Sequence, residues 1–366
     1  MATTTPESAP AHPRVHPELA GALARLPVRP ENPYADIEAV RANFAALMAP
    51  RMTAPDPRVT VRHTSFTGPD GNTVEVQVLR PAGVGGVLPG VLYIHGGGFA
   101  YGELDGPSPM ARDACAAAGA VVVNVHYRLA PEHRYPAGVE DCYAALEWMA
   151  GTAGDLGIDA ARIAVTGASA GGCLSAALCL MARDRQGPRI AFQGLLIPCL
   201  DDRGRTASMR RITDPRYANG TGMRHMWDTY LGPDRGPDVP AYAAPARATD
   251  LTGLPPAYVL TCGLDPLRDE GLDYARRLVE ADVPVELKDV PGAWHLFEAY
   301  APESEPARRT TAHWLGALRT ALAAAPDRSA APDCSAAPDR SAAPDRSAAP
   351  ARAGGDGPGR SGRPGR

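Results

Sequence analysis

A serine among small residues is the first candidate for chemistry in this sequence. Ser169 lies in the run GASAGG at residues 167–172, between an apolar run that predicts a strand and a stretch that predicts a helix. A nucleophilic serine on a sharp strand-to-helix turn requires small neighbours, because its strained backbone leaves no room for larger ones. The G-x-S-x-G pattern alone is a weak signal. Its place between a strand and a helix predicts a nucleophile rather than a glycine-rich turn without chemistry.

A second group of small residues could supply hydrogen-bond donors. The run HGGGF at residues 95–99 directly follows residues 91–94, which predict a buried strand. Consecutive glycines leave backbone N–H groups free to point at a developing oxyanion. With the amide of Ala170, the residue after the serine, they could form an oxyanion hole of three donors. A simple glycine loop is the alternative. A phosphate cradle is not favoured, because neither GxxxxGK[ST] nor GxGxxG is present.

A serine nucleophile needs a base, and the base needs an orienting acid. His295 follows the last predicted strand in a predicted loop, at the carboxyl ends of strands where catalytic groups gather. His313 lies inside the predicted terminal helix, and we interpret it as structural. Asp265 directly follows another predicted strand. Asp269 and Glu270 fall in the first turn of the next helix, where negative charge suits the helix dipole, so we interpret them as dipole partners.

The elements that must position these residues alternate along the chain. Continuous apolar runs predict buried strands, and apolar spacing of 3.6 residues predicts helices. Strands are predicted at residues 59–66, 73–79, 91–94, 120–125, 162–166, 193–197, 257–261 and 283–290. Helices are predicted at residues 107–118, 138–150, 170–182, 268–281 and 306–323. This alternation predicts an α/β fold with a mostly parallel central sheet of about eight strands, flanked by helices and opened by an antiparallel hairpin.

Two segments depart from the alternation. Residues 16–26 and 34–48 have helical apolar spacing before the first strand. Residues 201–250 interrupt the later part of the sheet and are irregular and polar, apart from one predicted helix. Its apolar positions are Met223, Met226, Trp227, Tyr230 and Leu231. An insertion of this size on a regular sheet usually forms a lid or a binding element.

The composition excludes several function classes. The chain has 366 residues, of which 45% are hydrophobic, and a net charge of only -4. This charge favours neither a nucleic-acid partner nor stable membrane insertion. No apolar run is long enough to span a bilayer, and the N-terminus does not resemble a secretory signal. The 7 cysteines include no CxxC pair or metal-ligand spacing, so we expect a cytoplasmic protein without a metal or cofactor.

The C-terminal end is predicted to be a disordered tail. Residues 324–366 contain repeats of SAAPDR followed by a run of glycine, proline and arginine. Such a segment has no large apolar side chains whose burial could offset the entropy lost on ordering.

Taken together, the motifs resemble the hormone-sensitive-lipase-like esterases (bacterial family IV), a branch of the α/β-hydrolase superfamily. HGGGF at 95–99, GASAGG at 167–172, DPLRDEG at 265–271 and HLF at 295–297 stand in that family's order. The run YRLAPEHRYPAGVED at 127–141 is also similar to a family segment. The resemblance covers roughly residues 32–323. Two positions depart from the family's usual pattern: Ala168 in the serine motif and His126 before the YRL run.

The resemblance implies an α/β-hydrolase fold with a helical cap and assigns a role to each candidate. Ser169 would be the nucleophile, His295 the general base and acid, and Asp265 the orienting acid, while Gly97, Gly98 and Ala170 would form the oxyanion hole. The implied organisation is N-terminal cap helices at 1–50, a catalytic domain at 51–323 with a cap insertion at about 201–250, and the tail. The implied substrate is a small-molecule ester with a short to medium acyl chain, and the implied assembly is a homodimer.

Two other functions remain open. The same triad serves an amidase, formamidase or deacetylase of a specialised metabolite. A ligand-binding protein on the same scaffold belongs to a different class, and such proteins typically lack a member of the triad. All three residues are present in this sequence.

Overall fold

A sheet of eight strands forms the centre of the computed structural model, which describes residues 15–52, 56–102 and 108–323. Its order is β1-β2-β4-β3-β5-β6-β7-β8. The strands are β1 Val59–Thr67, β2 Thr73–Pro81, β3 Leu88–Ile94, β4 Val121–His126, β5 Ile158–Ala168, β6 Phe192–Leu196, β7 Ala257–Leu264 and β8 Val285–Trp294. β2 pairs antiparallel with β1 and β4, and every other neighbouring pair is parallel. The predicted α/β fold with an antiparallel hairpin at one edge is therefore confirmed.

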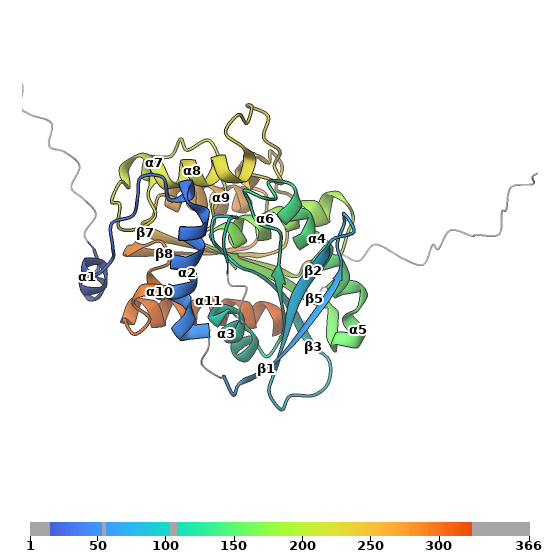
Figure 1. Cartoon of the computed structure of the whole chain (residues 1–366). Helices are drawn as coiled ribbons and strands as arrows, with labels where there is room; N and C mark the ends of the chain where they lie inside the picture. The colour runs from blue at the N-terminus through green and yellow to red at the C-terminus, as the bar shows by residue number, and fades with distance from the viewer. Residues whose placement is uncertain (1–14, 53–55, 103–107, 324–366) are drawn as a thin grey trace, which may run out of the picture. The chain divides into compact units, whose positions relative to one another are not determined.

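Helices cover both faces of this sheet (Figure 1). They are α1 Pro17–Ala24, η1 Pro33–Ala35, α2 Ile37–Met52, α3 Pro109–Ala118, α4 Ala137–Gly151, α5 Ala153–Leu156, α6 Ala170–Asp184, α7 Ala207–Arg211, α8 Gly220–Leu231, η2 Pro245–Arg247, α9 Arg268–Glu280, α10 Phe297–Tyr300 and α11 Glu305–Ala323. In Figure 1, α6 and α9 lie on one side of the sheet, while α3 and α11 lie on the other. None of the helices in the described ranges is both long and apolar enough to span a membrane.

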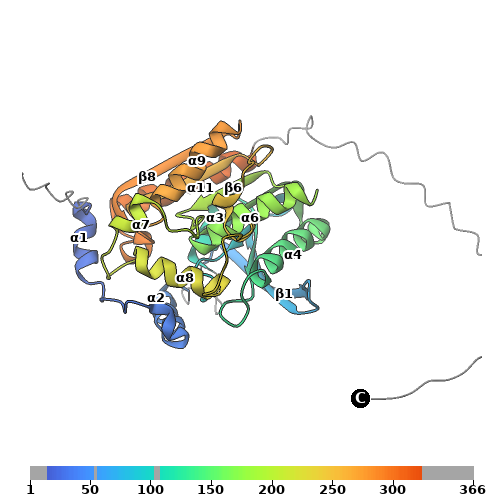
Figure 2. The ribbon, with the colours of Figure 1, turned by 90° about the horizontal axis from the view of Figure 1, so that it is seen from above.

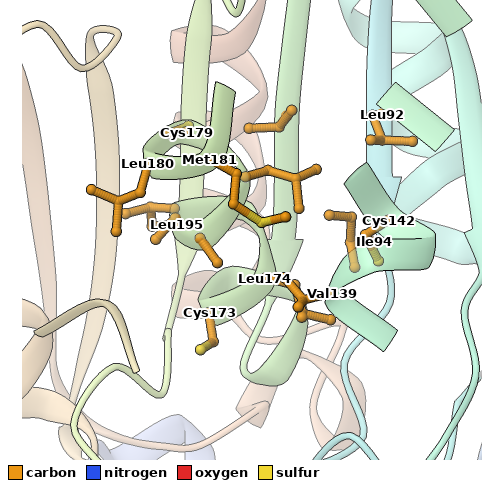
Figure 3. Packing of buried hydrophobic residues seen from close by; sticks show 14 of the residues in the cluster. Leu92, Ile94, Val139, Cys142, Cys173, Leu174, Cys179, Leu180, Met181 and Leu195 are labelled. Atoms are coloured by element: carbon orange, nitrogen blue, oxygen red, sulfur yellow. The ribbon is translucent and has the colours of Figure 1, made fainter. Parts of the chain in front are cut away.

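The core is divided between the two faces of the sheet because side chains alternate along a strand. In β3, Leu92 and Ile94 pack with α4 and α6, whereas Val91 and Tyr93 pack with α3 and α11. Figure 3 shows the first of these clusters, where Leu174 on α6 lies close to Val139 on α4. The strands in the middle of the sheet are buried on both faces, and their apolar runs are continuous for this reason.

The last strand is longer than predicted. We expected it to end at Val290, with His295 in a loop, but β8 continues to Trp294. A bulge between Cys262 and Leu264 shifts the register of β7, so that Leu264 pairs with Trp294. The prediction was wrong because Pro291 and Gly292 read as a turn in the sequence. His295 therefore follows the strand directly.

The predicted insertion and the N-terminal helices contribute neighbouring elements (Figure 2). The predicted helix in the insertion is α8, and Met226, Trp227 and Tyr230 are buried in it. η1 packs against α8, although the two are far apart in the sequence. The predicted tail at 324–366 and residues 1–14 lie outside the described residues, and the domain boundaries remain predictions.

Candidate active site

Ser169 occupies a strained turn between β5 and α6. Its backbone has φ 58° and ψ -116°, which a non-glycine residue rarely adopts, and its side chain is buried. The turn is possible because Gly167 and Gly171 lie against β3. A Cβ atom at either position would be 2.2 or 2.0 Å from the carbonyl oxygen of Ile94. The small residues predicted around the serine are therefore required by the close approach of two strands and a helix.

The structure brings Ser169, His295 and Asp265 together. The Nε2 atom of His295 is 3.0 Å from Oγ of Ser169, and its Nδ1 atom is 2.6 Å from Oδ2 of Asp265. A carboxylate only accepts hydrogen bonds, so Nδ1 carries the proton and Nε2 is free to accept the serine hydroxyl proton. All three side chains are buried, which strengthens the attraction between the aspartate and any positive charge on the imidazole.

Asp265 is held in place by the turn that follows β7. Its Oδ1 atom accepts the backbone N–H of Leu267 at 2.9 Å, while Oδ2 faces the histidine. The carboxylate is 1% exposed, and the turn begins α9 at Arg268. One oxygen is thus fixed by the backbone and the other orients the imidazole, as expected for a residue at the carboxyl end of a strand.

The glycine loop after β3 presents backbone donors beside the serine. In the described part of the chain, the N–H groups of Gly97, Gly98 and Ala170 have no hydrogen-bond partner. Gly97 has φ 116° and Gly98 has φ 56°, which favour glycine. A Cβ atom on Gly97 would lie 1.8 Å from the carbonyl oxygen of Tyr101. These three donors fit a site for a developing negative charge.

His95 holds the glycine loop through a contact with the backbone of Gly96. Its ring stacks on Tyr127 with centroids 4.3 Å apart, and Nδ1 lies 2.7 Å from the carbonyl oxygen of Gly96. Burial lowers the pKa of His95 to about 4, so the imidazole is neutral and Nδ1 donates the hydrogen bond. Tyr127 also donates to the carbonyl oxygen of His95 at 3.1 Å. The loop is thereby fixed before substrate arrives.

Cap residues from two distant segments close over this loop. A Cβ atom on Gly98 would lie 2.1 Å from the hydroxyl oxygen of Tyr34 and 3.2 Å from Cγ of Met226. Phe99 stacks on Tyr230 of α8, with ring centroids 3.8 Å apart. Tyr34 was not singled out in the sequence. Helical spacing predicted α8, but no local pattern indicates which residue of the N-terminal segment reaches the loop.

Asp269 and Glu270 do more than complement a helix dipole, so our interpretation of them was incomplete. Both lie in the first turn of α9, as predicted. Asp269 accepts the backbone N–H of Ser208 at 2.7 Å, and buried Glu270 accepts those of Leu200 and Asp201 at 2.6 and 3.2 Å. They connect the base of the insertion to the turn that carries Asp265. Only the tertiary structure brings these backbone donors close to the two carboxylates, because they lie about 60 to 70 residues earlier in the chain.

Comparisons with known proteins identify the family to which this chain belongs. A family model described as alpha/beta hydrolase fold matches residues 91–299. The chain belongs to the α/β-hydrolase fold family. It is 39% identical over 300 residues to the carboxylesterase NlhH of Mycobacterium tuberculosis, covering 79% of this chain and 90% of that protein. It is 35% identical to an ethyl acetate hydrolase of Pseudomonas putida, covering 69% and 79% of the two chains.

Solved structures extend the comparison. A bacterial heroin esterase has a TM-score of 0.81 and 43% identity, covering 85% of this chain and 98% of the other. A thermostable esterase from Pseudomonas putida has a TM-score of 0.80 and 31% identity, covering 86% and 99%. The resemblance to hormone-sensitive-lipase-like esterases is thereby confirmed, and this α/β-hydrolase is a member of a family of carboxylic ester hydrolases.

Proposed function

We propose that this α/β-hydrolase is a serine carboxylesterase that cleaves small esters with short to medium acyl chains, through Ser169, His295 and Asp265. The observation that carries the proposal is the pair of hydrogen bonds from Asp265 through His295 to Ser169, 2.6 and 3.0 Å long. A strained serine on a strand-to-helix turn supports the same chemistry, as do three adjacent backbone N–H groups that have no partner among the described residues.

In the first half of the reaction, Nε2 of His295 takes the hydroxyl proton while Oγ of Ser169 attacks the ester carbonyl. The carbonyl oxygen becomes an oxyanion, to which Gly97, Gly98 and Ala170 donate. A donor of this kind contributes about 3 kcal/mol to the stability of the transition state. The bond to the alcohol then breaks, and Nε2 returns the proton to the leaving oxygen. The acyl group remains on the serine.

In the second half, water takes the place of the alcohol. Nε2 of His295 removes a proton from water, the resulting oxygen nucleophile attacks the acyl-enzyme, and the same donors hold the second oxyanion. The acid leaves as Oγ of Ser169 recovers its proton. Asp265 stabilises the imidazolium in both halves through its bond to Nδ1 and does not itself accept the proton.

Crowding above the oxyanion loop supports the proposed preference for shorter acyl chains. Tyr34 and Met226 both approach Gly98, and Phe99 is covered by Tyr230. Filled space of this kind discriminates by volume, because each additional methylene must displace packed side chains. The homodimer and the cytoplasmic location remain predictions from the sequence.

The test is hydrolysis of 4-nitrophenyl esters from acetate to dodecanoate, by the wild type and by Ser169→Ala. We expect turnover to fall for the longer chains and to drop by about 10⁶-fold in the variant. A folded wild type that cleaves none of these esters would overturn the proposal. Faster cleavage of 4-nitroacetanilide than of the acetate ester would instead identify an amidase.

A further inference from the structure

Among the described residues, no carboxylate pairs with the positive charge of Arg29. Within the described residues its guanidinium forms no ion pair, and its one side-chain hydrogen bond is to the hydroxyl of Tyr300 at 2.9 Å. The backbone N–H of Arg29 is bound to the carbonyl oxygen of Pro215 in the insertion, 2.9 Å away. The residue is half-buried, so its position is fixed while the guanidinium retains free donors.

Tyr300 contacts the guanidinium of Arg29, and the charge of Arg29 acts on Tyr34 and Tyr101, which come from two other parts of the chain. Tyr300 ends α10, which follows His295, while Tyr101 follows the oxyanion glycines and Tyr34 lies in η1. The rings of Tyr34 and Tyr101 have centroids 6.4 Å apart. Burial raises the pKa of both hydroxyls, and the charge of Arg29 acts against that rise in each.

The same group of residues reaches the reacting centre. The hydroxyl of Tyr34 would lie 2.1 Å from a Cβ atom on Gly98, and the backbone of Tyr101 lies against Gly97. The hydroxyl of Tyr34 thus lies at the oxyanion loop, and the hydroxyl of Tyr300 lies on the guanidinium of Arg29. Other arginines in the described part of the chain form ion pairs, as Arg128 does with Asp141 and Arg247 with Asp202.

We infer that Arg29, Tyr34, Tyr101 and Tyr300 form an anion-recognition site, and that the preferred substrates are esters that also carry a carboxylate. This inference rests on the proposed esterase function and names its substrate class. A guanidinium offers five donors in a planar fork that matches a carboxylate, and phenol hydroxyls can donate to the same group. Because one face of this site is the oxyanion loop, the carboxylate and the ester belong to the same molecule.

A purely structural role for Arg29 is the competing explanation. The residue joins the N-terminal segment to the insertion and to α10, and such a tie alone would stabilise the cap. A structural tie affects neutral and anionic esters equally. A recognition site changes the ratio between them.

The experiment measures kcat/KM for two matched pairs of esters. 4-Acetoxybenzoate and its methyl ester differ by a charge on the alcohol side. Mono-4-nitrophenyl glutarate and 4-nitrophenyl pentanoate differ by a charge on the acyl side. We expect the wild type to favour the anionic member of at least one pair. We expect Arg29→Met to lower that anionic-to-neutral ratio by about tenfold or more.

Two further variants separate charge from structure. Arg29→Lys retains the charge without the planar fork, so it should recover part of the ratio. Arg25→Met removes an exposed arginine of the same N-terminal segment and should leave the ratio within about twofold. An unchanged ratio in Arg29→Met, in both pairs, would overturn the inference and leave Arg29 as a structural tie.

Failure of the inference can be distinguished from failure of the esterase proposal. If neutral esters are cleaved and the ratio does not depend on Arg29, only the anion site is wrong. If no ester is cleaved, calorimetric titration with 4-hydroxybenzoate still tests the site. Binding that is lost in Arg29→Met and kept in Arg25→Met supports it. No binding to the wild type rejects it.

Discussion

The candidate active site has two parts that are built differently. The proposed reacting groups of the first part each follow the end of a strand: Ser169 after β5, Asp265 after β7 and His295 after β8. The second part, which covers them, comes from η1 and α8 and meets the first through side-chain packing. The first part is positioned by the backbone hydrogen bonds of one sheet and the second by contacts between distant segments. Chemistry and selectivity should therefore respond to different substitutions.

The largest expected effect is on the first part, in Asp265→Asn. The amide can donate to Nδ1 of His295 and so favours the wrong tautomer, which should lower kcat by about 10⁴-fold without unfolding the protein. Steady-state kinetics measure kcat, and circular dichroism shows whether the variant is folded. As a control, Asp289→Asn changes a half-buried carboxylate on β8 that accepts from Thr261. Asp289→Asn should retain most activity, and equal losses in both variants would contradict the assignment.

The next effect concerns the oxyanion loop, in Gly97→Ala. The new Cβ atom must displace the backbone of Tyr101, so the N–H donors move and kcat should fall by about 10²- to 10³-fold. Gly119→Ala is the matched control, because Gly119 has φ 62° but nothing within 4 Å of a Cβ atom. The control should lose about 1 kcal/mol of stability and little activity. If the two variants had equal kcat values, the loop would not be the oxyanion site.

A smaller effect is expected from the cap, in Met226→Ala. Removing this side chain opens space above Gly98, so kcat/KM for hexanoate relative to acetate should rise by about tenfold. Met149→Ala removes the same atoms beside Gly90, at the other end of β3. Both variants should lose about 2–5 kcal/mol of stability. Only Met226→Ala should change the acyl preference, and a shift in both would show that general loosening is the cause.

The smallest effect is a change in how stability depends on pH, in Glu270→Gln. Burial raises the pKa of Glu270 well above 4.5, although the two backbone donors oppose that rise. The folded state then holds a proton that the unfolded chain loses near pH 4.5, so wild-type stability should decrease as pH rises above that value. Glutamine keeps the accepting oxygen and cannot titrate. Urea unfolding between pH 4.5 and 8 should show a shallower decrease in the variant, and identical slopes would exclude Glu270 as the cause.

The residues at the strand ends could be predicted from the sequence, whereas the contacts that cover them could not. Ser169, Asp265 and His295, which the structure brings together, could be proposed from the sequence because each adjoins an apolar run. Strands that lie side by side bring their carboxyl ends together. The strand at 283–290 was placed correctly but ended too early, since a bulge opposite Gly263 allows β8 to continue to Trp294. Glu270 was interpreted as a partner of its own helix dipole, because a carboxylate in the first turn of a helix is explained without a distant partner.

The sequence by itself determined the fold class, the order of strands and helices, and the types and spacing of the residues proposed to react. These features depend on apolar periodicity and on small residues at tight turns, which are local properties of the chain. The tertiary structure alone decided that Tyr34 lies beside Gly98, that Arg29 donates to Tyr300, and that Glu270 holds the insertion. These contacts join residues far apart in the sequence, and packing of distant surfaces leaves no periodic signal in either segment.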